Sequence, residues 1–177
     1  MRPVTLRVAT PGDRDFLLDL FASTRSLEFA ALPSPQAQQF VQMQFQMQQR
    51  SYAACYPAAE NKIILLAGEP IGRILIDRSP PHLLLVDIAL LPLYRGRGIG
   101  SALIEELLNE AGSLNRAVKL SVYLANPALR LYERLGFSKI SEEGLYAEMK
   151  WSGPDASGRV TKTIEEEKKK HDRTPGV

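Results

Sequence analysis

A glycine-arginine loop is the part of this sequence whose residue types and spacing could do chemistry. The loop Arg95-Gly96-Arg97-Gly98-Ile99-Gly100 follows the apolar run 83–90, which is typical of a central strand, and it opens a stretch with helical periodicity. Backbone N–H groups at glycine can approach an anion closely, because glycine has no Cβ. A helix N-terminus adds partial positive charge, and the two arginines add full charges. The sequence therefore predicts a cradle for a pyrophosphate.

Two common nucleotide-binding loops do not fit this pattern. A Rossmann loop needs G-x-G-x-x-G and an acidic residue about 20 positions later. Here the glycines are Gly96, Gly98 and Gly100, and the region around Ser121 lacks the acid. A P-loop needs Gly-Lys-Ser/Thr, which is absent. Taken alone, the loop fits a plain surface turn equally well.

A second motif lies downstream and suggests a family. The segment Asn126-Pro127-Ala128-Leu129-Arg130-Leu131-Tyr132-Glu133-Arg134-Leu135-Gly136-Phe137 resembles the N-x-A…LY-x-x-x-GF segment of the GNAT acetyltransferase superfamily. The arginine-glycine loop resembles the family's R/Q-x-x-G-x-G/A signature, and Ile88-Ala89-Leu90-x-Pro92 resembles its fourth strand. The two motifs come in the family's order, and the resemblance extends from the first predicted strand to Trp151.

The resemblance implies an N-acetyltransferase that moves an acetyl group from acetyl-CoA to a primary amine by direct attack in a ternary complex. The pantetheine arm would bond to the backbone of the fourth strand at Ile88, Ala89 and Leu90, with the Leu90 N–H aimed at the thioester carbonyl. Asn126 would contact the cofactor arm, and Arg95 would assist the pyrophosphate. The pyrophosphate itself would lie on the loop amides, at Gly96, Arg97, Gly98, Ile99, Gly100 and Ser101.

The same resemblance implies that Tyr132 protonates the departing thiolate. The general base stays open: the fifth strand lacks the glutamate of relatives that acetylate ribosomal-protein N-termini, which leaves Asp87, Glu28, or a water relayed by Ser121 or Tyr123. The acceptor pocket is expected from residues 25–50 and the strand near Tyr123. Other readings remain: Tyr132 as a core aromatic, Asn126 as a plain N-cap, and the whole chain as a non-catalytic CoA-binding module.

Hydrophobic periodicity predicts an α/β domain over residues 1–151 with one mixed sheet and helices on its faces. The family resemblance implies that this sheet is mostly antiparallel and twisted, with about seven strands and about four helices. Helices are predicted after a Thr10–Asp13 capping box, from Ser34-Pro35, from Ile99 and from Asn126-Pro127. Part of the second of these helices has a conflicting pattern: in residues 41–48, apolar residues alternate with Gln, which is the period of a strand. Strands are predicted at 3–9, 63–67, 71–77, 83–90, 117–124, 137–140 and 145–151. The charged, apolar-poor stretch 152–177 is predicted to be a disordered tail.

Composition narrows the function classes. A net charge of +2 argues against a dedicated nucleic-acid binder, and no apolar run is long enough for a membrane span. A single cysteine, Cys55, excludes an intrachain disulfide, and with His82 and His171 alone it cannot complete a tetrahedral Cys/His metal site. The N-terminus reads as a strand and not as a signal peptide, so we expect a cytoplasmic protein. The expected partners are CoA and an amine-bearing small molecule or peptide; a homodimer is left open.

Overall fold

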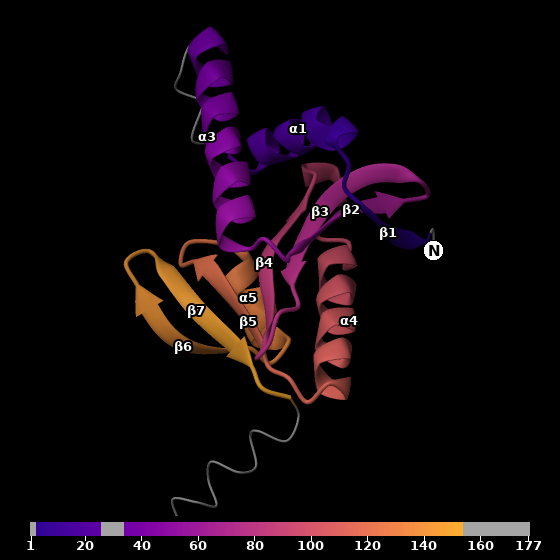
Figure 1. Ribbon diagram of the computed structural model, residues 1–177, viewed down its shortest axis with the longest axis vertical. Helices are drawn as coiled ribbons and strands as arrows, with labels where there is room; N and C mark the ends of the chain where they lie inside the picture. Colours follow the sequence, from indigo (N-terminus) through magenta and orange to yellow (C-terminus); the bar gives the residue numbers. More distant parts are fainter. Residues whose placement is uncertain (1–2, 26–33, 154–177) are drawn as a thin grey trace, which may run out of the picture.

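The structure is a computed structural model of the chain, and it describes residues 3–25 and 34–153. A seven-stranded sheet runs through the molecule in the order β1-β2-β3-β4-β5-β7-β6 (Figure 1). All neighbours pair antiparallel except β4 and β5, which pair parallel. The α/β fold predicted from the sequence is confirmed. The strands are β1 Val4–Val8, β2 Glu60–Leu66, β3 Glu69–Asp77, β4 Leu83–Leu90, β5 Val118–Tyr123, β6 Ser138–Glu143 and β7 Tyr146–Trp151.

Four α-helices lie in the described part of the chain and cover both faces of the sheet. They are α1 Arg14–Thr24, α3 Ser34–Cys55, α4 Ile99–Ser113 and α5 Ala128–Arg134, with short 3-10 turns η1 Pro11–Asp13 and η2 Pro92–Tyr94. Helices α4 and α5 bury one core against one face, and α1 and α3 bury a second core against the other. Figure 1 shows α3 projecting past the sheet beside α1.

The ambiguous segment 41–48 is helical, and the reason is burial at helical spacing. Val41 and Phe45 lie four residues apart on α3 and are both buried. Phe45 packs its ring 5.8 Å from that of Phe21 on α1. The alternating Gln residues of this stretch therefore reflect composition and not a strand face.

Strand β4 carries an irregularity at the point where the site is expected. Its pairing with β3 shifts register between Leu85 and Asp87, which leaves Val86 as the extra residue of a β-bulge. Its parallel pairing with β5 covers only Leu83 to Leu85. The second half of β4 therefore has no partner on the β5 side among the described residues.

Two expectations lie partly or wholly outside the described residues. The proposed tail, 152–177, is described only to residue 153, and the candidate base Glu28 falls within the undescribed stretch 26–33.

None of the described helices is long and apolar enough to cross a membrane. The described ranges also contain no cluster of three His, Cys, Asp or Glu side chains that could hold a metal ion.

Candidate functional site

The backbone of β4 presents hydrogen-bonding groups where it leaves β5. The Leu91 N–H donates to the Ile71 carbonyl at 2.9 Å, so the N–H of Leu91 faces β3. Hydrogen-bonded pairs alternate along antiparallel strands, so the peptide groups of Ala89 also face β3, whereas those of Ile88 and Leu90 face the opposite way. The Leu90 N–H therefore points to the side where the β5 pairing has ended.

Arg95 binds the other backbone polar group of Leu90, its carbonyl. Its Nε donates to the Leu90 carbonyl at 2.8 Å, which ties the loop after β4 back to the strand. Arg97 lies over the ring of Tyr94, with the guanidinium carbon 5.5 Å from the ring centroid. Both arginines thus lie beside the glycine loop, where their charge contributes to the field at the start of α4.

The glycine loop has the geometry of an anion cradle. Gly96 and Gly98 have φ values of +70° and +78°, a region that favours glycine, and Gly98 is the N-cap of α4. The first helical hydrogen bond runs from the Ala102 N–H to the Gly98 carbonyl at 3.0 Å, so the amides of residues 99–101 precede the intrahelical ladder. A Cβ built on Gly100 would meet nothing within 4 Å. These amides therefore have no acceptor within the helix, and the space beside the Gly100 Cα is empty.

Asn126 lies just before α5, whose N-cap residue is Pro127 and not Asn126 as the sequence reading had it. Its Oδ1 accepts a hydrogen bond from the Ala128 N–H at 2.9 Å, which leaves its amide NH₂ free of that role. The same turn borders a cavity of about 380 Å³ at the β5–α5 junction. Arg130 also lines this cavity, so a cation and an amide face one space.

Tyr132 lies on the face of α5 that packs into the core. Its side chain is 7% exposed, and its ring meets the ring of Phe137 edge-on with centroids 5.7 Å apart. Burial and the negative charge of Asp87 raise the pKa of Tyr132 to about 12. The influence of Asp87 on this phenol places a β4 carboxylate and the α5 tyrosine in one electrostatic environment.

A buried arginine completes the site and was missed from the sequence. Arg73 on β3 forms an ion pair with Asp87, approaches the Gln48 Oε1 at 3.4 Å and lies 5.4 Å from the ring centroid of Tyr52. Burial, and then the charge of Asp87, raise the pKa of Tyr52 to about 12. The only sequence signal for this cluster is an arginine inside the apolar run Ile71-Gly72-Arg73-Ile74-Leu75-Ile76.

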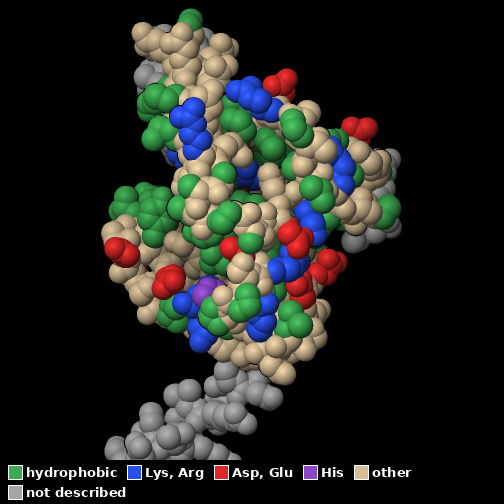
Figure 2. Space-filling view, viewed as in Figure 1, with side chains coloured by type: hydrophobic (Ala, Val, Ile, Leu, Met, Phe, Trp, Pro, Cys, Tyr) green, Lys and Arg blue, Asp and Glu red, His purple; other side chains and the backbone are tan. Residues whose placement is uncertain are grey.

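The neighbouring face of β5 and β7 is aromatic and exposed. Tyr123 pairs with Tyr146 across the two strands, and their rings are 5.7 Å apart in an edge-on arrangement. Figure 2 shows apolar side chains gathered over this end of the sheet, where Tyr146 is 55% exposed. The candidate relay residue Ser121 is exposed on the same strand and is paired with Glu148. Tyr146 and Glu148 were not predicted from the sequence.

Comparisons with known proteins identify the family of this chain. The profile of the acetyltransferase (GNAT) family matches residues 18–137. An uncharacterized protein of Mycobacterium leprae is 37% identical over 108 residues, which are 58% of this chain but only 27% of that protein.

Solved structures share the fold. The N-acetyltransferase PaiA of Thermoplasma acidophilum, solved with coenzyme A, has a TM-score of 0.64 at 15% identity and covers 85% of this chain and 99% of its own. The spermidine N-acetyltransferase of Vibrio cholerae, solved with CoA and spermine, has a TM-score of 0.57 at 21% identity and covers 84% of this chain and 94% of its own. With the family profile spanning both motifs, the chain belongs to the GNAT acetyltransferase family.

Proposed function

We propose that this protein transfers an acetyl group from acetyl-CoA to a primary amine of a small molecule or peptide, by direct attack in a ternary complex. The observation that carries the proposal is the parting of β4 from β5 beside the Leu90 N–H, with Tyr132 and the glycine loop on the same side of the sheet. Family membership supports acetyl transfer, and this geometry supports a thioester carbonyl lying along β4.

The residues present fit CoA. The open amides of residues 99–101 and the adjacent arginines suit a pyrophosphate, because helix N-termini and guanidinium groups both stabilise negative charge. Asn126 and Arg130 would face the cofactor arm from the cavity at the start of α5. When bound, acetyl-CoA supplies the activated acetyl group as a thioester. The solved relative of Thermoplasma acidophilum binds coenzyme A, which is consistent with this assignment.

Leu90 and Tyr132 would act on the two atoms that gain charge. The Leu90 N–H would donate to the carbonyl oxygen as it becomes an oxyanion, an interaction often worth about 3 kcal/mol. The Tyr132 hydroxyl would donate to the sulfur as the C–S bond breaks. A phenol whose pKa is about 12 keeps its proton at neutral pH and is a weaker acid than a thiol at about 8.5. Its contribution is therefore a hydrogen bond to the sulfur. The proton that leaves the attacking nitrogen goes to the base, and the departing thiolate takes its proton from water.

Asp87 is our proposed base. Arg73 holds its Oδ2, so the proton from the amine would go to Oδ1, directly or through a water. A water held by Ser121 or Tyr123 is the alternative, because both lie on the adjacent strand at the end that leaves β4. The two routes predict different results for Asp87→Asn: turnover should fall by roughly 10²-fold or more if Asp87 is the base, and should change little if a water relay is.

The decisive experiment measures free thiol released from acetyl-CoA with a panel of polyamines, amino acids, aminoglycosides and peptides. Polyamines belong in the panel because one structural relative is a spermidine N-acetyltransferase. We expect turnover with at least one amine, and acetylation at its nitrogen by mass spectrometry. Stabilisation of the fold by CoA together with no turnover across the panel would favour a CoA-binding module instead.

A further inference from the structure

Arg73 is a charged residue at a position where charge is costly. It lies inside the apolar run 71–76 of β3, and its side chain is 5% exposed. Its Nε is buried without a hydrogen-bond partner among the described residues, which adds to the cost. An ion pair buried in this way is often no more stable than apolar side chains of similar volume. Stability alone therefore does not account for an arginine at this position.

Two contacts with helix α3 hold the guanidinium of Arg73. Its Nη2 lies 3.4 Å from the Gln48 Oε1, and its central carbon lies 5.4 Å from the ring centroid of Tyr52. Gln48 and Tyr52 are four residues apart, so they lie on one face of the helix. The same Nη2 donates to the Asp87 Oδ2. Arg73 therefore connects α3 to the carboxylate on β4.

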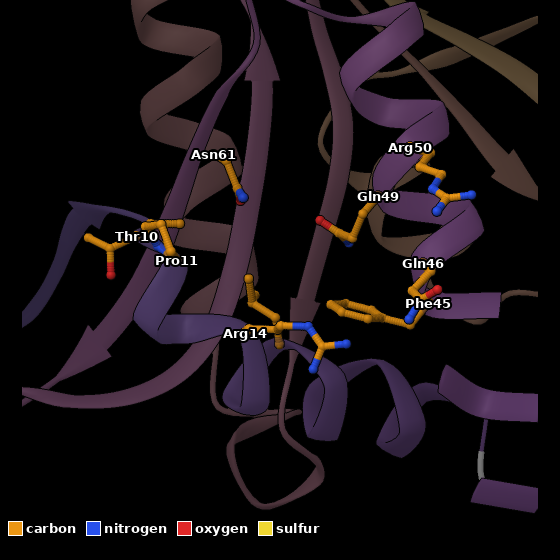
Figure 3. A pocket seen from close by; sticks show the side chains of 10 residues that line it. Thr10, Pro11, Arg14, Phe45, Gln46, Gln49, Arg50 and Asn61 are labelled. Carbon is orange, nitrogen blue, oxygen red and sulfur yellow. The ribbon is translucent and has the colours of Figure 1, made fainter. Parts of the chain in front are cut away.

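Helix α3 also borders a cavity, and the ion pair lies outside it. The cavity has a volume of about 480 Å³ and lies between the helix, the turn before α1 and the start of β2 (Figure 3). Gln49 and Arg50 line it from α3, whereas neither Arg73 nor Asp87 is among its lining residues. The contacts of Gln48 and Tyr52 with Arg73 therefore belong to the part of the helix that faces β4.

Asp87 is the member of the ion pair that a substrate can reach. Its side chain is 23% exposed, against 5% for Arg73. It follows the bulge at Val86, where β4 no longer pairs with β5. Burial, and then the charge of Asp87, raise the pKa of Tyr132, which packs in the core on the other face of the sheet. The position of this one carboxylate therefore affects both faces of the sheet at the candidate site.

We propose that Arg73 is a positioning residue that acts on the reaction through Asp87. This inference rests on the proposed function, in which Asp87 accepts the proton of the attacking amine. Arg73 occupies the Oδ2, which leaves the Oδ1 for that proton, and Gln48 and Tyr52 keep the guanidinium in place. Arg73 itself neither contacts the amine nor exchanges a proton. Helix α3 thereby determines where the base lies.

Arg73→Lys tests this role, because lysine keeps the positive charge but lacks the planar fork of donors. With an amine that the wild-type protein acetylates, kcat should fall by roughly tenfold or more, since a small misplacement of a reacting group is costly. KM for the amine should change little, because Arg73 does not contact it. The urea midpoint should stay closer to wild type than that of Arg73→Met, because the charge beside Asp87 is retained. A purely charge-neutralising role predicts instead that lysine restores kcat together with stability.

Three further variants complete the experiment. Arg78→Lys is the matched control: Arg78 directly follows β3 and donates to Glu110 on α4 at 2.6 and 2.8 Å, so its kcat should equal that of wild type. Arg73→Lys/Asp87→Asn should be no slower than Asp87→Asn, because losses from residues that act as a unit are not additive. Gln48→Leu removes a helix contact and keeps the ion pair, so it should also lower kcat, and it replaces Arg73→Lys if that variant does not fold.

The outcomes separate this inference from the proposed function. Full kcat in Arg73→Lys, or a further loss in the double variant, would overturn the positioning role and leave acetyl transfer intact. A loss in Arg73→Lys with none in Asp87→Asn would overturn both the positioning role and the assignment of Asp87 as the base. If the wild-type protein acetylates none of the amines in the panel, the proposed function itself fails, and the positioning role fails with it.

Discussion

Arg73 and Asp87 form an ion pair between adjacent strands beside the candidate site. Arg73 pairs with Ala89 in the β3–β4 register, so the two charged side chains meet diagonally across the ladder. The Arg73 side chain is 5% exposed and that of Asp87 is 23% exposed. Removing either one would leave the other as an uncompensated charge in a poorly solvated place, close to Tyr132.

Replacing Arg73 with Met should therefore destabilise the protein strongly. The expected loss is about 3 kcal/mol in the free energy of unfolding, because the Asp87 carboxylate would stay buried without its partner. Urea denaturation monitored by circular dichroism measures it. The double variant Arg73→Met/Asp87→Leu should recover most of the loss, since both charges are then gone.

A surface ion pair provides the control for this prediction. Lys139 and Glu142 are paired on β6 with both side chains about half exposed, so Lys139→Met should cost less than about 1 kcal/mol. Equal losses for Arg73→Met and Lys139→Met would contradict the view that Arg73 neutralises a buried charge.

The sequence predicted the elements with strong local patterns and missed the contacts that only packing creates. Residues 83–90 form a strand with the predicted bounds, because an unbroken apolar run of that length suits a central strand. The capping box at Thr10 is also present, since it depends on residues three positions apart. In contrast, the first predicted strand of the β2–β3 hairpin was too short, because Glu60, Asn61 and Lys62 continue the ladder without an apolar signal.

The same division applies to the site. The glycine loop and the α5 motif are contiguous in sequence, so a family resemblance could find them. The Arg73 cluster joins β3, β4 and α3. Arg73 lies 14 positions from Asp87 and 25 positions from Gln48 in the sequence, and no local pattern links them. The base and the amine acceptor therefore remain predictions, because both depend on such long-range contacts.

Gly100→Asp should abolish CoA binding while leaving the fold intact. A Cβ at this position meets nothing within 4 Å, and the backbone is helical, so the substitution is sterically tolerated. The added carboxylate would repel a pyrophosphate at the open amides. Wild-type protein at a CoA concentration of 100 Kd should gain about 2.7 kcal/mol, a rise in Tm of roughly 5–10 °C. The variant should show no rise, and Ala102→Asp, exposed in the same turn, should retain more of it.

Asp13→Asn should destabilise the start of α1 at neutral pH. Hydrogen bonds from Arg7, and then from the Thr10 N–H, hold the pKa of Asp13 well below its ordinary range. Because the folded-state pKa is depressed, the stabilisation is present above the unfolded pKa of about 3.9 and is lost as the pH falls through the folded value. The variant should lose about 1 kcal/mol at pH 7. In denaturation curves from pH 7 to pH 2, its deficit relative to wild type should shrink below about pH 4; a constant deficit would contradict the assignment.

Tyr132→Phe separates a catalytic role from packing, because it removes one hydroxyl and keeps the ring against Phe137. With an accepted amine, turnover should fall by roughly 10²-fold or more, while the Kd for CoA changes little, since the phosphate contacts lie on the glycine loop. The loss should appear in kcat more than in KM, the pattern of an interaction made in the transition state. Near-full turnover would leave Tyr132 a core aromatic.

The same variant has a signature in stability that does not depend on turnover. The pKa of Tyr132 is raised to about 12, above the unfolded value of about 10, so between these values the folded state holds a proton that the unfolded state has lost. The stabilisation from this group is therefore complete below pH 10 and is lost as the pH rises towards 12.

The unfolding free energy of the wild-type protein should thus fall more steeply over this range than that of Tyr132→Phe, which cannot titrate there. Tyr52, whose pKa is raised to the same value, should contribute a separate and similar slope, so Tyr52→Phe measured alongside tests whether the two tyrosines act independently. Parallel wild-type and Tyr132→Phe curves would show that Tyr132 does not lie in the buried, Asp87-facing environment on which its catalytic role depends.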